Sequence, residues 1–159
     1  MKDFAIESVQ PADVGEILTL QRAAYVSEAQ LYGDVALPPL VQTLDELASE
    51  LARSMALKAR IGERIVGAGR AVLEGSVLHI GRLTVAPDLQ GCGIGTGLLG
   101  ALEQLGAPDA ERYTLFTGHL STANIRLYQR LGYREVRREE LQPGVTLVHL
   151  DKRAVSDAP

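Results

Sequence analysis

LTVAPDLQGCGIGTGLL, residues 83–99, passes from a β-like run through a glycine-rich turn into an apolar, helix-like run. Glycine lets backbone N–H groups converge on a ligand, because no Cβ stands in the way. The first turn of a helix adds unpaired N–H donors and a partial positive charge. A tight turn that only packs the helix closely is the alternative, but each glycine at a helix start costs about 0.5–1 kcal/mol. The stretch therefore predicts an anion site suited to a pyrophosphate, with glycines at 91, 93, 95 and 97.

Two common phosphate-binding motifs fit this stretch less well. A Walker loop needs Gly-Lys-Ser/Thr after the glycines, and no lysine is present here. A dinucleotide fingerprint starting at Gly91 would need a third glycine where Thr96 stands. The strands expected before the loop also form an antiparallel meander and not a βαβ unit. A nucleotide-binding protein is therefore a weaker alternative.

Working outward from the glycine loop, hydrophobic periodicity and turn signals predict an α+β fold with a mixed, mostly antiparallel central sheet flanked by helices. Residues 26–42 read as a loop or broken helix because they contain a glycine and a proline pair. Thr43 opens a capping box and Ser121 is predicted to cap a helix. The expected strands are 4–9, 55–61, 64–73, 77–85, 112–117, 133–138 and 145–150, and the expected helices are 11–25, 43–53, 93–105 and 121–131.

Length and composition limit the classes of protein to consider. The 159 residues are the size of one domain, so residues 1–159 are expected to form a single domain with a frayed tail at about 152–159. The net charge of −4 lacks the basic footprint of a nucleic-acid binder. One cysteine and three dispersed histidines favour no metal site. No signal peptide or membrane-spanning run is evident, so we expect a cytoplasmic protein without a membrane partner.

Two motifs together resemble the GNAT superfamily of acyl-CoA-dependent N-acyltransferases. Residues 90–95, Gln-Gly-Cys-Gly-Ile-Gly, match the acetyl-CoA signature Q/R-x-x-G-x-G/A. Residues 121–133, STANIRLYQRLGY, are similar to the family's N-x-R-L-Y-x-x-x-G-Y/F element. The resemblance covers about residues 4–150. It implies a GNAT-like sheet with a splayed strand pair at the acyl-CoA site, and acetyl-CoA as the acyl donor.

The resemblance also implies which residues contact the donor. The backbone of Leu83, Thr84 and Val85 would pair with the pantetheine amides. Either Ser121 or Asn124 would reach the pantetheine from the following helix. Gln90 would shape the turn, and the pyrophosphate would lie on the backbone of Gly91, Cys92, Gly93, Ile94, Gly95 and Thr96. Relatives often carry Arg or Lys where Cys92 stands; a reactive thiolate at this helix start is an alternative to a small loop residue.

The resemblance assigns the catalytic acid to Tyr128, whose hydroxyl would return a proton to the departing thiolate. His79 stands where some members place a basic group, six residues before Val85, and imidazole titrates near neutral pH. Other relatives use a glutamate on the next strand, where this chain has Phe116; His119 is a weaker substitute. A packing role for Tyr128 and a solvent-facing role for His79 are the alternatives.

Substrate specificity in this family comes mostly from the segment between the first two helices, where Tyr25, Glu28 and Tyr32 are the candidate acceptor-binding residues. Residues 1–60 carry five basic and nine acidic residues, so the whole net charge lies there and favours a cationic amine. The hypothesis is an N-acetyltransferase whose primary-amine acceptor, a small molecule or peptide, attacks directly through a tetrahedral intermediate. A non-catalytic acyl-CoA-binding or sensor module is the alternative, and a homodimer is left open.

Overall fold

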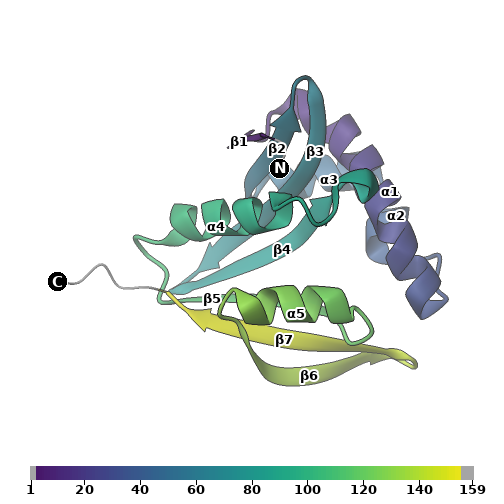
Figure 1. Cartoon of the computed structure of the whole chain (residues 1–159), viewed down its shortest axis with the longest axis vertical. Coiled ribbons are helices and arrows are strands. Elements are labelled where there is room, and N and C mark those ends of the chain that lie inside the picture. Colours follow the sequence, from purple (N-terminus) through teal and green to yellow (C-terminus); the bar gives the residue numbers. More distant parts are fainter. Residues whose placement is uncertain (1–2, 155–159) are drawn as a thin grey trace.

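The computed structural model describes residues 3–154 and contains one seven-stranded sheet in the order β1-β2-β3-β4-β5-β7-β6 (Figure 1). Only β4 and β5 are parallel; every other neighbouring pair is antiparallel. The predicted mixed, mostly antiparallel sheet with flanking helices is therefore confirmed. The strands are β1 (Ala5–Ser8), β2 (Met55–Ile61), β3 (Arg64–Glu74), β4 (Val77–Val85), β5 (Arg112–Gly118), β6 (Arg134–Gln142) and β7 (Val145–Arg153).

Helices cover both faces of the sheet. The helix α4 (Ile94–Gly106) packs against β2, β3 and β4 on one face, and α5 (Thr122–Arg130) lies over β5 and β7 on that same side (Figure 1). On the other face, α1 (Val14–Tyr32) packs against β3 and β4, and α3 (Leu44–Ala52) against β2. A short helix, α2 (Pro38–Val41), joins α1 to α3. Among residues 3–154, no helix is both long and apolar enough to cross a membrane.

The first long helix continues well past its predicted end at residue 25. A 3₁₀ turn at Pro11–Asp13 leads into α1, which runs to Tyr32 and ends at Gly33 with φ 63°. The predicted helix end at residue 25 was wrong, because no residue between 26 and 32 interrupts a helix; Gly33 is the first that does. The broken helix, the other interpretation of residues 26–42, is present, since α1 ends at Tyr32 and α2 begins at Pro38. The second helix starts as predicted: the Glu46 N–H donates to Thr43 Oγ1 at 3.2 Å, and the Thr43 N–H to Glu46 Oε1 at 3.0 Å.

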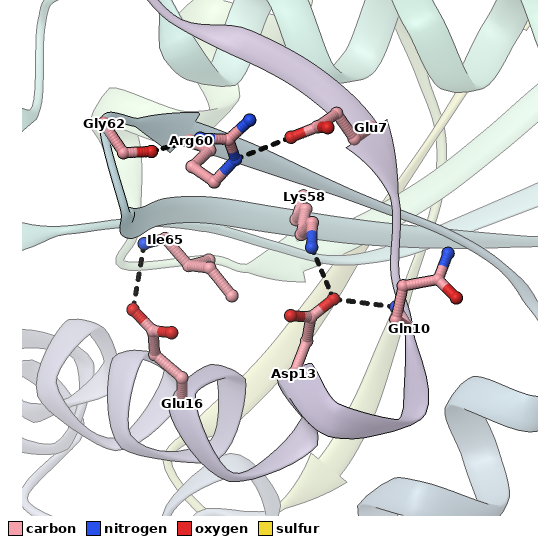
Figure 2. A network of polar contacts seen from close by, with 8 residues as sticks. All are labelled: Glu7, Gln10, Asp13, Glu16, Lys58, Arg60, Gly62 and Ile65. Atoms are coloured by element: carbon pink, nitrogen blue, oxygen red, sulfur yellow. Dashed lines mark hydrogen bonds and ion pairs between the residues drawn. The ribbon is translucent and has the colours of Figure 1, made fainter.

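Carboxylates near the start of α1 attach it to the sheet (Figure 2). Asp13 accepts from Lys58 Nζ at 2.6 Å and from the Gln10 N–H at 2.7 Å. Glu16 accepts from the Ile65 N–H at 2.9 Å, next to an irregular step in the pairing of β2 with β3. These contacts fix the position of α1 on β2 and β3. The remaining contacts drawn join Arg60 to Glu7 and to the Gly62 carbonyl.

The two parallel strands separate after a short paired stretch. Pairing joins only residues 77–79 of β4 to 112–114 of β5, although β4 continues to Val85 and β5 to Gly118. The glycine loop follows the part of β4 that pairs with β3 but not with β5, and α5 follows the part of β5 that pairs with β7 but not with β4. The splayed strand pair implied by the resemblance is present.

The last strand extends into the segment predicted to be a frayed tail. Lys152 and Arg153 belong to β7, and the Ala154 N–H donates to the Glu111 carbonyl at 2.9 Å. Lys152 Nζ also reaches the Glu103 carboxylate at 3.1 Å. The tail prediction was therefore wrong for residues 152–154, because β5 offers this segment a pairing partner. Residues 155–159 lie outside the described part of the chain.

Candidate active site

The glycine loop presents an uncapped helix start. Gly91 and Gly93 have φ of 77° and 85°, values that favour glycine. Gly93 is the N-cap residue of α4, where no side chain caps the helix and no acidic residue occupies the first turn. Within residues 3–154, the first-turn N–H groups of α4 thus have neither an N-cap side chain nor a first-turn carboxylate as acceptor. This arrangement fits the pyrophosphate of an acyl-CoA donor, which would bind to the backbone from Gly91 to Thr96.

The side chains of the glycine loop differ in how exposed they are. Ile94 is 1% exposed and belongs to the core, so only its backbone is available to a ligand. Gln90 and Thr96 are exposed. Cys92 is half-buried, with its Sγ 3.9 Å from the Gln90 carbonyl oxygen. A Cβ added at Gly95 would meet Val85 at 3.6 Å, so the loop returns close to the end of β4.

The end of β4 contains a local irregularity at Arg82, whose φ of 51° is the one positive φ of a non-glycine residue in the described part of the chain. The register between β3 and β4 shifts at this point. Beyond it, Leu83 and Val85 are half-buried on the α4 side, as their contacts with Gly69 and Gly95 show. Thr84 is buried among residues of α1 and α3.

A hydrogen-bond chain joins the end of α1 to the start of α5. The Leu120 N–H donates to Tyr32 Oη at 3.0 Å, and Ser121 Oγ donates to Glu28 Oε2 at 2.5 Å. Tyr32 Oη lies 3.1 Å from Ser121 Oγ, so the tyrosine hydroxyl is the donor between them. The serine hydroxyl does not cap α5, contrary to the prediction, because Glu28 and Tyr32 engage it instead.

Tyr128 lies inside this group and is 8% exposed. Burial, followed by the neighbouring Tyr25 and Glu28, raises the pKa of Tyr128 well above its ordinary value. The hydroxyl is therefore protonated at neutral pH, as a proton donor must be. The structure thus brings together residues predicted separately as acceptor-binding, pantetheine-binding and catalytic: Tyr25, Glu28, Tyr32, Ser121 and Tyr128. Asn124 is half-buried one helical turn after Ser121.

His79 stands apart from this cluster. It lies in the stretch of β4 that is still paired with β5, and its Nε2 is 3.4 Å from Glu74 Oε2. Its side chain is about half exposed, at 49%. The weaker candidate base, His119, accepts the Thr146 N–H on its Nδ1 at 3.1 Å. Phe116, which stands where other relatives have a glutamate, is exposed, and its ring contacts His149.

Two residues that shape the candidate site, Gly118 and Arg82, were not predicted from the sequence. A Cβ on Gly118 would come within 1.9 Å of Tyr32 Oη, so only glycine leaves room for this tyrosine. Arg82 carries the positive φ and projects into the cavity between the sheet, α1 and α3. No local pattern marks either residue, since both roles arise from contacts between distant segments. Within residues 3–154, no cluster of three or more His, Cys, Asp or Glu is placed to hold a metal ion.

A mixed sheet that parts at one parallel pair, with an uncapped glycine-rich helix start beside the gap, is the architecture of an acyl-CoA-dependent acyltransferase. The family model described as an acetyltransferase (GNAT) domain matches residues 28–154. The chain therefore belongs to the GNAT acetyltransferase family, whose members transfer acyl groups from acyl-CoA. No match was found among curated protein sequences.

Solved structures share the whole fold. The ribosomal-protein-S18-alanine N-acetyltransferase from Escherichia coli has a TM-score of 0.80 and 16% identity, covering 98% of this chain and 97% of that one. PaiA N-acetyltransferase from Thermoplasma acidophilum, in complex with coenzyme A, has a TM-score of 0.77 and 14% identity, with 96% and 99% covered. YncA from Salmonella typhimurium, with its cofactor acetyl-CoA, has a TM-score of 0.76 and 16% identity, with 99% and 98% covered.

Proposed function

We propose that this protein is an acetyl-CoA-dependent N-acetyltransferase that acts on a primary amine. The observation that carries the proposal is the position of Tyr128. Its protonated hydroxyl is buried and interacts with the Glu28 carboxylate, and it lies on α5, the helix that follows β5. An acid and a carboxylate next to each other suit a reaction that adds one proton and removes another. Solved structures of the same fold bind CoA or acetyl-CoA, which supports the choice of donor.

Acetyl-CoA supplies the thioester carbonyl carbon. The free amine of the acceptor attacks this carbon, forming a C–N bond and a tetrahedral intermediate. The C–S bond then breaks, and Tyr128 gives its proton to the thiolate. The uncapped N–H groups between Gly91 and Thr96 hold the pyrophosphate, and the backbone of Leu83, Thr84 and Val85 orients the pantetheine arm.

The proton lost by the amine needs an acceptor, and two residues are candidates. His79 remains a candidate through a chain of waters, because its exposed side chain is open to solvent. Glu28 is the candidate nearer the acid, since it neighbours Tyr128 and uses Oε2 to accept from Ser121. The pH profile of kcat/KM separates them: the variant that lacks the base, His79→Ala or Glu28→Gln, loses the acidic limb. A variant whose profile is unchanged is excluded as the base.

The test of the proposed function is release of free CoA, followed with a thiol reagent, across amino acids, polyamines, amino sugars and peptides. Tyr128→Phe is expected to lower kcat by about 100-fold or more, as removal of a general acid does. The KM for acetyl-CoA should stay the same. The matched control is Tyr133→Phe, because Tyr133 is also buried but donates its hydroxyl proton to Glu103. Equal rates for wild type and Tyr128→Phe would contradict the acid role.

A non-catalytic acyl-CoA-binding module is the competing function. It predicts that acetyl-CoA raises the unfolding temperature, with a stabilisation of about 2.7 kcal/mol at 100 times the Kd. It also predicts that no amine releases CoA faster than water does. Stabilisation by NAD or ATP, but not by acetyl-CoA, would contradict both functions.

A further inference from the structure

The irregular step in β4 places a positive charge inside the protein. Arg82 lines a small cavity of about 10 Å³ between the sheet, α1 and α3. The residue as a whole is partly exposed, but its Nη1 is buried and has no hydrogen-bond partner within residues 3–154. A buried guanidinium nitrogen without an acceptor is unfavourable, because desolvation is not compensated. An acceptor group is therefore missing at this point.

The polar groups around Arg82 already have partners. Arg70 Nη2 donates to Glu50 Oε2 at 2.5 Å, so the carboxylate in the cluster is held by the other arginine. Gln21 Nε2 donates to the Pro39 carbonyl and to the Gln42 side-chain oxygen. Arg70 and Arg82 both act on Glu50, but only Arg70 is hydrogen-bonded to it, so no carboxylate within residues 3–154 binds Arg82 Nη1. The missing acceptor is best supplied by an anion.

Tyr25 links this positive end to the proposed reaction site. Its pKa is raised by burial; Arg82 opposes the rise and Glu28 adds to it, so both charges act on the same phenol. Thr84, two residues after Arg82 on β4, donates its hydroxyl to the Arg82 carbonyl at 2.9 Å and also opposes the rise in the pKa of Tyr25. Glu28 also neighbours Tyr128. Tyr25 therefore interacts with Arg82 and Glu28, and Tyr128 interacts with both Tyr25 and Glu28.

We propose that the acceptor is an amine that also carries a carboxylate, such as an amino acid. Its carboxylate would bind Arg82 while its amine lies beside Glu28 and Tyr128. This inference rests on the proposed N-acetyltransferase function. A guanidinium group suits carboxylates, because its planar donors match two oxygens. Charge complementarity at both ends favours such an acceptor over a polyamine, which would place a cation against Arg82.

The size of the cavity defines the competing explanation. A space of about 10 Å³ holds one water molecule. One carboxylate oxygen occupies a similar volume, so it can take the place of a water at Arg82 while the rest of the acceptor lies outside this cavity. A bound water satisfies the hydrogen bond of Nη1 but does not give Arg82 the charged acceptor that a carboxylate would. The two explanations therefore differ in how Arg82 affects the acceptor.

The test compares amines that differ only in the carboxylate. Glycine, β-alanine and 4-aminobutyrate, together with larger α-amino acids, are each assayed beside their amides and the corresponding alkylamines. Acids are expected to have the higher kcat/KM. Arg82→Gln should raise the KM for the acid by about 10- to 100-fold, the effect of losing a hydrogen bond between charged groups. The KM for the amide and for acetyl-CoA should not change. Arg82→Lys should retain part of the preference.

Arg153→Gln is the control variant, because Arg153 is exposed at the end of β7. It should keep the acid preference, and urea unfolding verifies that each variant is folded. Amides as good as acids, or an equal loss for both, would overturn the inference. So would a more stable Arg82→Gln with an unchanged KM, which is the outcome expected for water alone.

Failure of the proposed function has a different signature. If no amine of any class releases CoA, N-acetyl transfer is refuted. The anion site is then judged by thermal shift with the same amino acids and amides in the presence of CoA. A shift produced by acids, absent with amides and lost in Arg82→Gln, would support the site without catalysis. The absence of any shift would overturn it.

Discussion

Replacing Gly118 by alanine tests the packing that positions the predicted acceptor-binding residues. An added Cβ would lie 1.9 Å from Tyr32 Oη and 2.5 Å from its Cζ. The tyrosine ring must therefore move by about 1 Å or more to reach ordinary van der Waals separation. Its hydroxyl is 3.0 Å from the Leu120 nitrogen and 3.1 Å from Ser121 Oγ, so such a movement breaks both hydrogen bonds.

Each of these hydrogen bonds contributes about 0.5–1.5 kcal/mol net, so Gly118→Ala is expected to lower the free energy of unfolding by about 1–3 kcal/mol. The KM for the acceptor should rise as well, because Ser121 and Glu28 lose the contact that orients them. The backbone itself tolerates alanine, since Gly118 is not among the positive-φ glycines. Urea unfolding measures the effect, provided that the m-value stays constant.

The control is a double-mutant cycle with Tyr32→Leu, which removes the atoms that the new Cβ would meet. In that background Gly118→Ala should cost little, about 0.5 kcal/mol or less. Gly100→Ala is a second control, because a Cβ at Gly100 meets nothing within 4 Å. An equal cost of Gly118→Ala in both backgrounds would refute the reasoning.

Three further predictions concern separate parts of the molecule. Gly106→Ala places a Cβ 2.7 Å from the buried Leu78 side chain, so it should lower the free energy of unfolding in urea by about 1–3 kcal/mol. An unchanged free energy of unfolding would mean that β4 and α4 can move apart. Gly93→Ala places a Cβ on a residue with φ 85°, which costs about 1–2 kcal/mol of strain. The variant should therefore bind acetyl-CoA about tenfold more weakly in calorimetry. An unchanged affinity would count against the loop as the pyrophosphate site. Burial disfavours ionisation of Asp13, but hydrogen bonds from Lys58 and the Gln10 N–H outweigh it and lower its pKa. The resulting stability is present above the unfolded-state pKa and is lost as the pH falls through the folded-state value, so Asp13→Asn should be less stable than wild type at pH 6 and approach it below about pH 4.

Sequence reasoning worked best where a pattern acts locally. The alternating glycines predicted a helix start at residue 93, and the structure begins α4 at Ile94. The capping box at Thr43 was read correctly for the same reason, because its partners are three residues apart. Even the sheet class followed from local turn signals and strand lengths.

The errors arose where a distant segment decides the outcome. Ser121 looks like a helix cap, but Glu28 and Tyr32, both on α1, take its hydroxyl. Arg82 adopts a positive φ because two strands change register beside it, which no neighbouring residue indicates. The roles of Tyr128 and His79 stay predictions, although the structure places Tyr128 among other candidate residues and His79 beside Glu74.

The short pairing between β4 and β5 has a mechanical consequence. Three residue pairs, 77–79 with 112–114, join a four-stranded half of the sheet to a three-stranded half. Beyond them, each half contributes an inner edge with no strand between. A donor bound along both edges would cross-link the halves, so amide hydrogen exchange in β5 and β7 should slow on binding more than in β2 and β3. Donor binding would then make the two halves unfold as one cooperative unit.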